Sequence, residues 1–262
     1  MEENTVENNE NKILTDDNTE IKSVATIEKK QPIDKDRRFR DSKFISFMIK
    51  IAKGIMEILW PTKILYKERF NIEGRAIITC NHYCSIDTNA IIKTYYKKKP
   101  FKVILKKELM EGNGFVARFL DQIGGIPIDR GKADIHAVKR ALRALKNDEQ
   151  LIIYPEGTRN KKDTKEMGPI KEGTAMFAIK TQSPIVPMMH YRCAKWYRRN
   201  YFIVGHPFTL EEFYNDKSHD VNARATEVIK QKYAELRAEV DEIVEVYHGS
   251  VAKYEKAHGL RK

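Results

Sequence analysis

His82 and Asp87 are the residues whose types and spacing point most directly to chemistry. They follow Asn81 at a junction, where the short apolar stretch 75–80 meets a stretch with helical spacing that begins at Ser85, its expected N-cap. If the chain turns back at this junction, the Asp87 carboxylate reaches the His82 imidazole. An imidazole held by a carboxylate is a general base that can take a proton from a hydroxyl group.

A similar junction follows the apolar strand expected at 151–154. Gly157 permits a tight turn, in which backbone N–H groups and the Thr158 hydroxyl would face a ligand. Arg159 offers the planar guanidinium that binds phosphate through two hydrogen bonds. We expect Glu156 either to hold Arg159 or to accept a hydrogen bond from a substrate hydroxyl.

Strands and helices alternate along the rest of the chain. Strands are expected at 75–80, 102–105, 123–130, 151–154, 185–189 and 201–205, and helices at 85–97, 108–121, 134–146, 172–180 and 223–247. This alternation predicts an α/β fold with a mainly parallel central sheet flanked by helices. Ligands in such folds bind beyond the carboxyl ends of the strands, where His82 and Arg159 lie, and where Arg130 would add a second cation.

Residues 43–60 carry a different pattern. At about 100° per residue, the polar side chains fall on one arc and apolar side chains fill the remainder, with Trp60 last before Pro61. A basic stripe, a broad apolar face and a terminal Trp are typical of a helix lying in a membrane interface. The charges inside the segment argue against a membrane span. The alternative is a helix packed on the core of the protein itself.

Length and composition limit the domain organisation and the class of partner. The 262 residues suit one main domain with appendages, and the formal net charge is +11. We expect a disordered tail at 1–40, an amphipathic membrane-binding segment at 41–66, the main domain at 67–215 and a charged C-terminal helix packed on it at 216–262. The basic charge indicates an anionic partner: a phospholipid surface, a phosphorylated substrate or nucleic acid. Three cysteines fit a reducing compartment, and no secretory signal is expected at the start.

Four motifs stand in order between about residues 65 and 210. They are Asn81-His82-Tyr83-Cys84-Ser85-Ile86-Asp87, then Lys106-Lys107-Glu108-Leu109 with Gly124-Gly125-Ile126-Pro127-Ile128-Asp129-Arg130, then Tyr154-Pro155-Glu156-Gly157-Thr158-Arg159 with Lys171-Glu172-Gly173, and finally Pro184-Ile185-Val186-Pro187. In these motifs the chain resembles the 1-acylglycerol-3-phosphate (lysophosphatidic acid) acyltransferase family of glycerolipid acyltransferases. Tyr154 replaces the commoner Phe of the third motif.

The resemblance implies a direct transfer of an acyl group. His82 would be the general base that takes the proton of the acceptor hydroxyl, and Asp87 would orient it. The substrate contacts that carry over are Lys106, Arg130, Glu156, Gly157, Thr158 and Arg159. No metal or prosthetic group is expected, because an acyl thioester is already activated, and no acyl-enzyme on Cys84 is implied.

The substrates and the location also follow from the resemblance. The acceptor would be lysophosphatidic acid and the product phosphatidic acid. The donor would be acyl-CoA or acyl carrier protein, since a basic surface suits both. The protein would lie on the cytoplasmic face of the membrane as a peripheral or monotopic protein, with no nucleic-acid partner.

Three alternatives remain open at this point. The same chemistry would serve another acceptor, such as glycerol-3-phosphate, another lysophospholipid or a glycolipid. The chain would also suit a catalytically silent membrane adaptor on the same fold. A zinc-stabilised nucleic-acid-binding protein would draw its ligands from Cys80, His82, Cys84, His190 and Cys193, although their spacing differs from that of common zinc knuckles.

Overall fold

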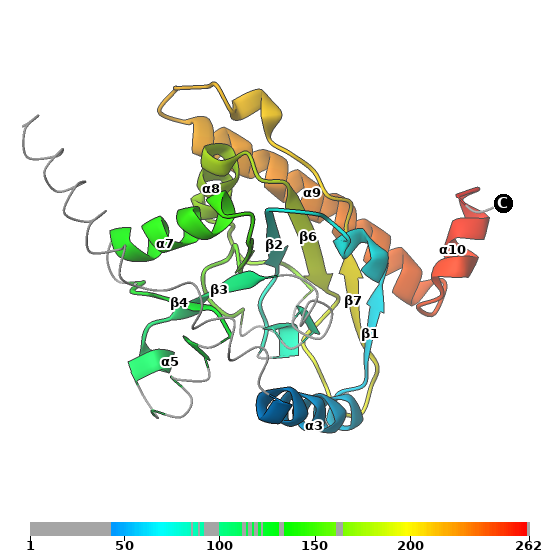
Figure 1. The fold of residues 1–262 in the computed structure, drawn as a ribbon. Helices are drawn as coiled ribbons and strands as arrows, with labels where there is room; N and C mark the ends of the chain where they lie inside the picture. Colours follow the sequence, from blue (N-terminus) through cyan, green and yellow to red (C-terminus); the bar gives the residue numbers. More distant parts are fainter. Residues whose placement is uncertain are drawn as a thin grey trace, which may run out of the picture. The chain divides into compact units, whose positions relative to one another are not determined.

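The computed structural model describes residues 43–84, 86–88, 90, 91, 100–111, 114, 117, 120, 121, 123–130, 134–160 and 165–260 (Figure 1). The expected tail at 1–40 lies outside the described residues, as do Ser85 and the end of the helix expected at 85–97. Residues 86–88, 90 and 91 are helical, which agrees with the described part of that expectation.

The described elements alternate as the sequence predicts. The strands are β1 (Thr62–Leu65), β2 (Ala76–Cys80), β3 (Phe101–Lys106), β4 (Gly125–Ile128), β5 (Gln150–Ile153), β6 (Ile185–His190) and β7 (Asn200–Val204). The helices are α3 (Lys43–Leu59), α5 (Glu108–Glu111), α7 (Ile135–Lys146), α8 (Gly173–Thr181), α9 (Val221–Glu245) and α10 (Val251–Ala257), with 3-10 turns η1 (Lys67–Phe70) and η2 (Glu211–Phe213).

The seven strands form one sheet in the order β1-β7-β6-β2-β5-β3-β4. The neighbouring strands run parallel, except for the antiparallel pair β6 and β7. The expected α/β fold with a mainly parallel sheet is therefore confirmed. Strand β2 lies between β5 and β6, so the residues that follow these three strands come together at one edge of the sheet.

Both faces of the sheet are buried, which explains the continuous apolar strands in the sequence. In β2, Ile77 packs in the core beneath α7, α8 and α9, whereas Ile78 packs in the core on the opposite face. Leu151 and Ile152 of β5 divide between the two cores in the same way. Figure 1 shows α9, in orange, running along the sheet beside β6 and β7. This packing holds the strand ends in a fixed register.

Two elements were not expected from the sequence. Residues 62–65 form β1, which pairs with β7, so the sheet begins inside the segment 41–66 that was assigned to membrane binding. Four residues that include Thr62 and Lys63 are too short and too polar to be recognised as a strand. The C-terminal region holds α10 as well as the expected long helix α9, whose inner side is buried on the sheet.

Helix α3 confirms the helix expected after residue 42, and it leaves an apolar stripe uncovered. Met56 and Trp60 are partly buried against the core, but Phe47, Ile51, Ile55, Ile58 and Leu59 are exposed. The first four of these are spaced by three or four residues and therefore share one side of the helix. No helix in the described part of the chain is long and apolar enough to cross a membrane.

Candidate active site

Asn81 joins the ends of two neighbouring strands, β2 and β6. Its side-chain Nδ2 donates to the His190 carbonyl oxygen at 3.0 Å, and its Oδ1 accepts from the His190 backbone N–H at 2.7 Å. The amide therefore acts like one more backbone unit of the β2–β6 ladder. This brings His82, the next residue, and His190 to the same edge of the sheet.

His82 and Asp87 form the pair that the sequence predicts. His82 Nδ1 and Asp87 Oδ2 are 2.9 Å apart, and the Asp87 side chain is fully buried while that of His82 is 9% exposed. Oδ2 also accepts the backbone N–H groups of Tyr83 at 2.7 Å and Cys84 at 2.8 Å. The turn between the two residues thus places the carboxylate against the imidazole ring.

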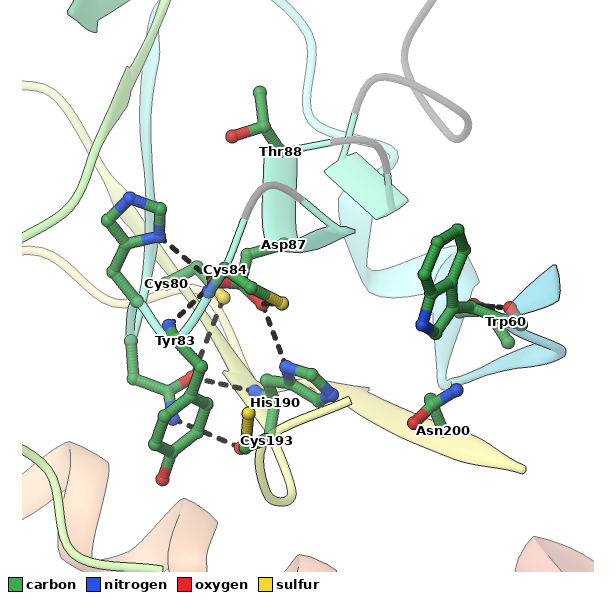
Figure 2. Close-up of polar contacts among 12 residues, drawn as sticks. Trp60, Cys80, Tyr83, Cys84, Asp87, Thr88, His190, Cys193 and Asn200 are labelled. Carbon is green, nitrogen blue, oxygen red and sulfur yellow. Dashed lines mark hydrogen bonds and ion pairs between the residues drawn. The ribbon is translucent and has the colours of Figure 1, made fainter. Parts of the chain in front are cut away.

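A second histidine binds the other oxygen of Asp87. His190 Nδ1 lies 2.8 Å from Oδ1, and Figure 2 shows His190 and Cys84 next to this carboxylate. Burial raises the pKa of Asp87, but the hydrogen bonds from His190 and His82 outweigh it, so the pKa lies below its usual value. Asp87 is therefore an ionised acceptor at neutral pH.

The ionised state of Asp87 sets the tautomer of His82. Because the carboxylate can only accept, Nδ1 of the neutral ring carries the proton and Nε2 keeps a lone pair. The Tyr154 ring stacks on His82 with centroids 3.9 Å apart, and the Tyr154 and Thr88 hydroxyl groups are 2.6 Å apart. None of the described residues hydrogen-bonds to Nε2. The ring is thus oriented as a general base would be.

Glu156 binds the protein backbone at the His82 junction. It is buried, and its Oε1 and Oε2 accept the backbone N–H groups of His82 and Gly168, each at 2.8 Å. Burial raises the pKa of Glu156, and these two hydrogen bonds oppose the shift. Both oxygens accept backbone N–H groups, so Glu156 fixes the His82 junction, and its role as a substrate contact stays a prediction.

Gly157, Thr158 and Arg159 follow Glu156 on the surface side of the junction. Gly157 has a φ of +69°, the left-handed conformation that glycine adopts readily. A Cβ at this position would lie 3.1 Å from Lys171 Nζ. Lys171 therefore lies beside the turn and adds a third cation to the expected pair, Arg159 and Arg130. Thr158 and Arg159 are exposed. The predicted anion-binding groups are therefore accessible.

Two further expected contacts, Lys106 and Arg130, follow β3 and β4. Burial lowers the pKa of the Arg130 guanidinium, Glu108 raises it and Arg159 lowers it, which places both groups within electrostatic reach of Arg130. Lys106 Nζ forms an ion pair with Glu108 at 2.8 Å. Cations of the second and third motifs thus share one region with an acid, Glu108.

The cysteines bear on two alternatives. Cys84 Sγ, Asp87 and His190 offer ligand atoms within 4.8 Å of one another, whereas Cys80 and Cys193 join no such group among the described residues. A metal ion there would have to displace the hydrogen bonds on Asp87. Burial and the Asp87 charge raise the pKa of the Cys84 thiol to about 11, so it is a neutral thiol rather than a nucleophile.

A pocket of about 580 Å³ lies beyond Glu156, between residues 165–170 and α9. Its apolar lining includes Met189 and Tyr233, and Arg237 contributes charge. Gly168 lines this pocket and also donates to Glu156. Gly168 thus connects the pocket wall to the carboxylate that fixes the His82 junction.

Comparisons with known proteins agree with these motifs. A family model described as Acyltransferase matches residues 62–191. A 1-acyl-sn-glycerol-3-phosphate acyltransferase from Bacillus subtilis is 26% identical over 204 residues, which cover 75% of this chain and 98% of that protein. A protein of the same name from Cocos nucifera is 34% identical over 150 residues, which cover 56% of this chain and 47% of that one.

The fold has a relative among solved structures. The 1-acyl-sn-glycerophosphate (LPA) acyltransferase from Thermotoga maritima matches with a TM-score of 0.50 and 19% sequence identity, covering 77% of this chain and 87% of that one. At this identity the likeness concerns the fold alone. The family match, however, contains β2, β5 and β6 and every residue of the site except those of α9. The chain therefore belongs to the acyltransferase family.

Proposed function

We propose that this acyltransferase moves a fatty acyl group from a thioester to the free hydroxyl of lysophosphatidic acid, giving phosphatidic acid. The observation that carries the proposal is the 2.9 Å contact between His82 Nδ1 and Asp87 Oδ2, which leaves the Nε2 lone pair for a substrate. The names of the relatives from Bacillus subtilis and Cocos nucifera supply the acceptor.

The reaction needs one base and no covalent enzyme intermediate. His82 Nε2 takes the proton from the acceptor hydroxyl as its oxygen attacks the thioester carbonyl. The Asp87 carboxylate stabilises the imidazolium that forms. When the tetrahedral intermediate collapses, the C–S bond breaks and the imidazolium returns its proton to the leaving sulfur. A C–O bond replaces the C–S bond, and the base is regenerated.

The acceptor phosphate would bind the cations beyond the strand ends. Arg159 offers two parallel N–H donors, Arg130 lies within its electrostatic reach, and Lys171 flanks the turn at Gly157. Lys106 is shared with Glu108 and would contribute less. The phosphate would hold the acceptor so that its hydroxyl, rather than a water molecule, meets His82.

The thioester donor would be acyl-CoA or acyl carrier protein. Both present negative charge near the thioester, CoA through its phosphates and the carrier protein through acidic side chains, so the basic surface favours each. No metal or prosthetic group is required, because the thioester carbonyl is already reactive and the sulfur is a good leaving group.

We also propose that the protein binds the membrane surface from the cytoplasmic side through α3. An exposed stripe formed by Phe47, Ile51, Ile55 and Ile58 suits the boundary between head groups and acyl chains. The loop 191–199, which holds two exposed aromatic residues, Trp196 and Tyr197, together with Arg192, Lys195, Arg198 and Arg199, adds a second contact. Asn200 N–H donates to the Pro61 carbonyl at 2.8 Å, so this loop ends beside the residues that follow α3.

The direct test is thiol release from palmitoyl-CoA, and from palmitoyl carrier protein, with three acceptors. Lysophosphatidic acid should give rapid release, monoacylglycerol should give little, and omission of the acceptor should give none. Glycerol-3-phosphate tests the alternative acceptor. A faster reaction with it than with lysophosphatidic acid would make it the acceptor in place of lysophosphatidic acid. Silence with both donors and every acceptor would contradict the enzymatic function.

A further inference from the structure

His190 is a buried histidine that the reaction described above does not use. Its side chain is 1% exposed, and its ring stacks on Phe202 with centroids 4.0 Å apart. Tyr83 contacts the ring edge-on at 5.6 Å. A substrate cannot reach a ring enclosed in this way, so His190 is not a second base.

The orientation of His190 is fixed by its backbone and by its ring. Asn81 holds its backbone N–H and carbonyl, and Phe202 holds the ring plane. Nδ1 points to Asp87 Oδ1 at 2.8 Å, while Nε2 has no hydrogen-bond partner among the described residues. Among the residues that the structure describes, the ring's one polar contact is therefore with the Asp87 carboxylate (Figure 2).

We propose that His190 is a positioning residue for acyl transfer: its Nδ1–H holds Asp87 Oδ1, so that Oδ2 stays on His82 and the carboxylate stays ionised. The inference rests on the proposed roles of His82 and Asp87. A protonated Asp87 would donate to His82 Nδ1 and move the ring proton to Nε2, which would remove the lone pair that the reaction needs.

Loss of the His190 donor should shift the acid limb of the pH–rate profile to higher pH. A buried carboxylate with one donor fewer is more basic, so it binds a proton at higher pH and also stabilises the His82 imidazolium more strongly. Both effects move the acid limb of the pH–rate profile upward. The titratable groups that surround Asp87 are His82, Tyr83 and Cys84 in its own turn, Cys80 at the end of β2, Tyr154 and Glu156 after β5, and His190.

Three substitutions of His190 separate the hydrogen bond from packing. His190→Phe keeps a ring against Phe202 but has no donor. His190→Asn places an amide N–H near the position of Nδ1, whereas His190→Gln places it near the position of Nε2, away from Asp87. Asn and Gln are matched in chemistry and both lose the ring, so they differ chiefly in whether the Asp87 contact is kept.

The measurement is kcat and KM across pH 5–9 for these variants, with thermal unfolding as the check of folding. We expect His190→Phe and His190→Gln to lower kcat about 10- to 100-fold and to raise the acid limb by about 0.5–1 pH unit, with KM little changed. The kcat of His190→Asn should stay within about fivefold of the wild-type value, and the acid limb of its pH–rate profile should not move. If His190→Phe does not fold, the comparison of His190→Asn with His190→Gln is sufficient to test the role of His190.

Two outcomes would overturn the inference. One is an unchanged kcat and acid limb in His190→Phe or His190→Gln. The other is an equal loss in Asn and Gln with the acid limb unmoved, which is the result expected of packing alone. His82→Ala, measured beside them, keeps the two proposals apart: an active His82→Ala would refute the base itself, whereas an inactive one with an unaffected His190→Phe would refute only the role of His190.

Discussion

Glu156 accepts the backbone N–H of His82 at 2.8 Å, so a carboxylate of the third motif fixes the backbone of the first. The other oxygen of Glu156 accepts from Gly168, which ties both motifs to the segment beside α9. Two stretches of chain more than 70 residues apart therefore meet in one buried group. This contact gives Glu156 a structural role that its place in the third motif does not indicate.

Gly168→Ala should disrupt that contact. A Cβ at Gly168 would lie 2.5 Å from Glu156 Oε2, so the carboxylate would have to move away from the His82 N–H. We expect kcat to fall about 10-fold or more, with some loss of thermal stability, since a displaced buried carboxylate loses one or both of its donors. Gly54→Ala is the matched control, because no atom lies within 4 Å of a Cβ there. Equal effects of the two substitutions would argue against the role of Glu156.

Asp87→Asn should abolish most of the activity while leaving the fold in place. An amide is nearly the same shape but cannot stabilise an imidazolium, so we expect kcat to fall about 10³- to 10⁴-fold with KM little changed. Steady-state kinetics with saturating donor would measure this. A loss of less than tenfold would show that His82 does not depend on Asp87.

The same substitution should change the stability of the protein in acid. The pKa of Asp87 is lowered in the folded state, so its ionised form stabilises the fold above the unfolded pKa of about 3.9, and this contribution is lost as the pH falls through the folded value. Thermal unfolding between pH 3 and pH 7 should therefore show that the stability of the wild type falls more steeply in acid than that of Asp87→Asn. Parallel curves would contradict an ionised Asp87.

Arg159→Ala should weaken the binding of phosphorylated acceptors in particular. Removing a charged donor from phosphate raises KM for lysophosphatidic acid about 10- to 100-fold, whereas the slow rate with monoacylglycerol should not change. Arg159→Lys keeps the charge but loses the bidentate hydrogen-bond geometry. Its KM for lysophosphatidic acid should therefore lie between the values of the wild type and of Arg159→Ala. Equal losses with both acceptors would place Arg159 away from the phosphate.

Ile55→Asp combined with Ile58→Asp should weaken membrane binding. Both side chains are exposed on α3, and burial of each in lipid is worth about 2 kcal/mol, so the double variant should bind anionic vesicles more than 10-fold less tightly. Ile135→Asp in α7 is the matched control, since that isoleucine is exposed too. Vesicle sedimentation measures the binding, and an unchanged double variant would exclude α3 as the contact.

The sequence predicted the sheet, the junction after β2 and the pairing of His82 with Asp87, because these depend on local pattern and on residues five positions apart. It did not predict that His190 shares Asp87, since 103 positions separate the two and only the β2–β6 register brings them together. One signal was available: His190 ends an apolar strand, at the same sheet edge as His82. Strand β1 gave no comparable signal, because its pairing with β7 depends on tertiary contacts.

His82→Ala tests the central claim most directly. Asp87 would keep its hydrogen bonds from Tyr83, Cys84 and His190, so the fold should survive, and thermal unfolding would verify this. The decisive quantity is the rate of acceptor-dependent thiol release relative to wild type at saturating substrates. A fall of about 10²- to 10⁴-fold in a folded variant is the result expected of a lost general base. Retention of more than a few per cent of the rate would show that His82 is not the base.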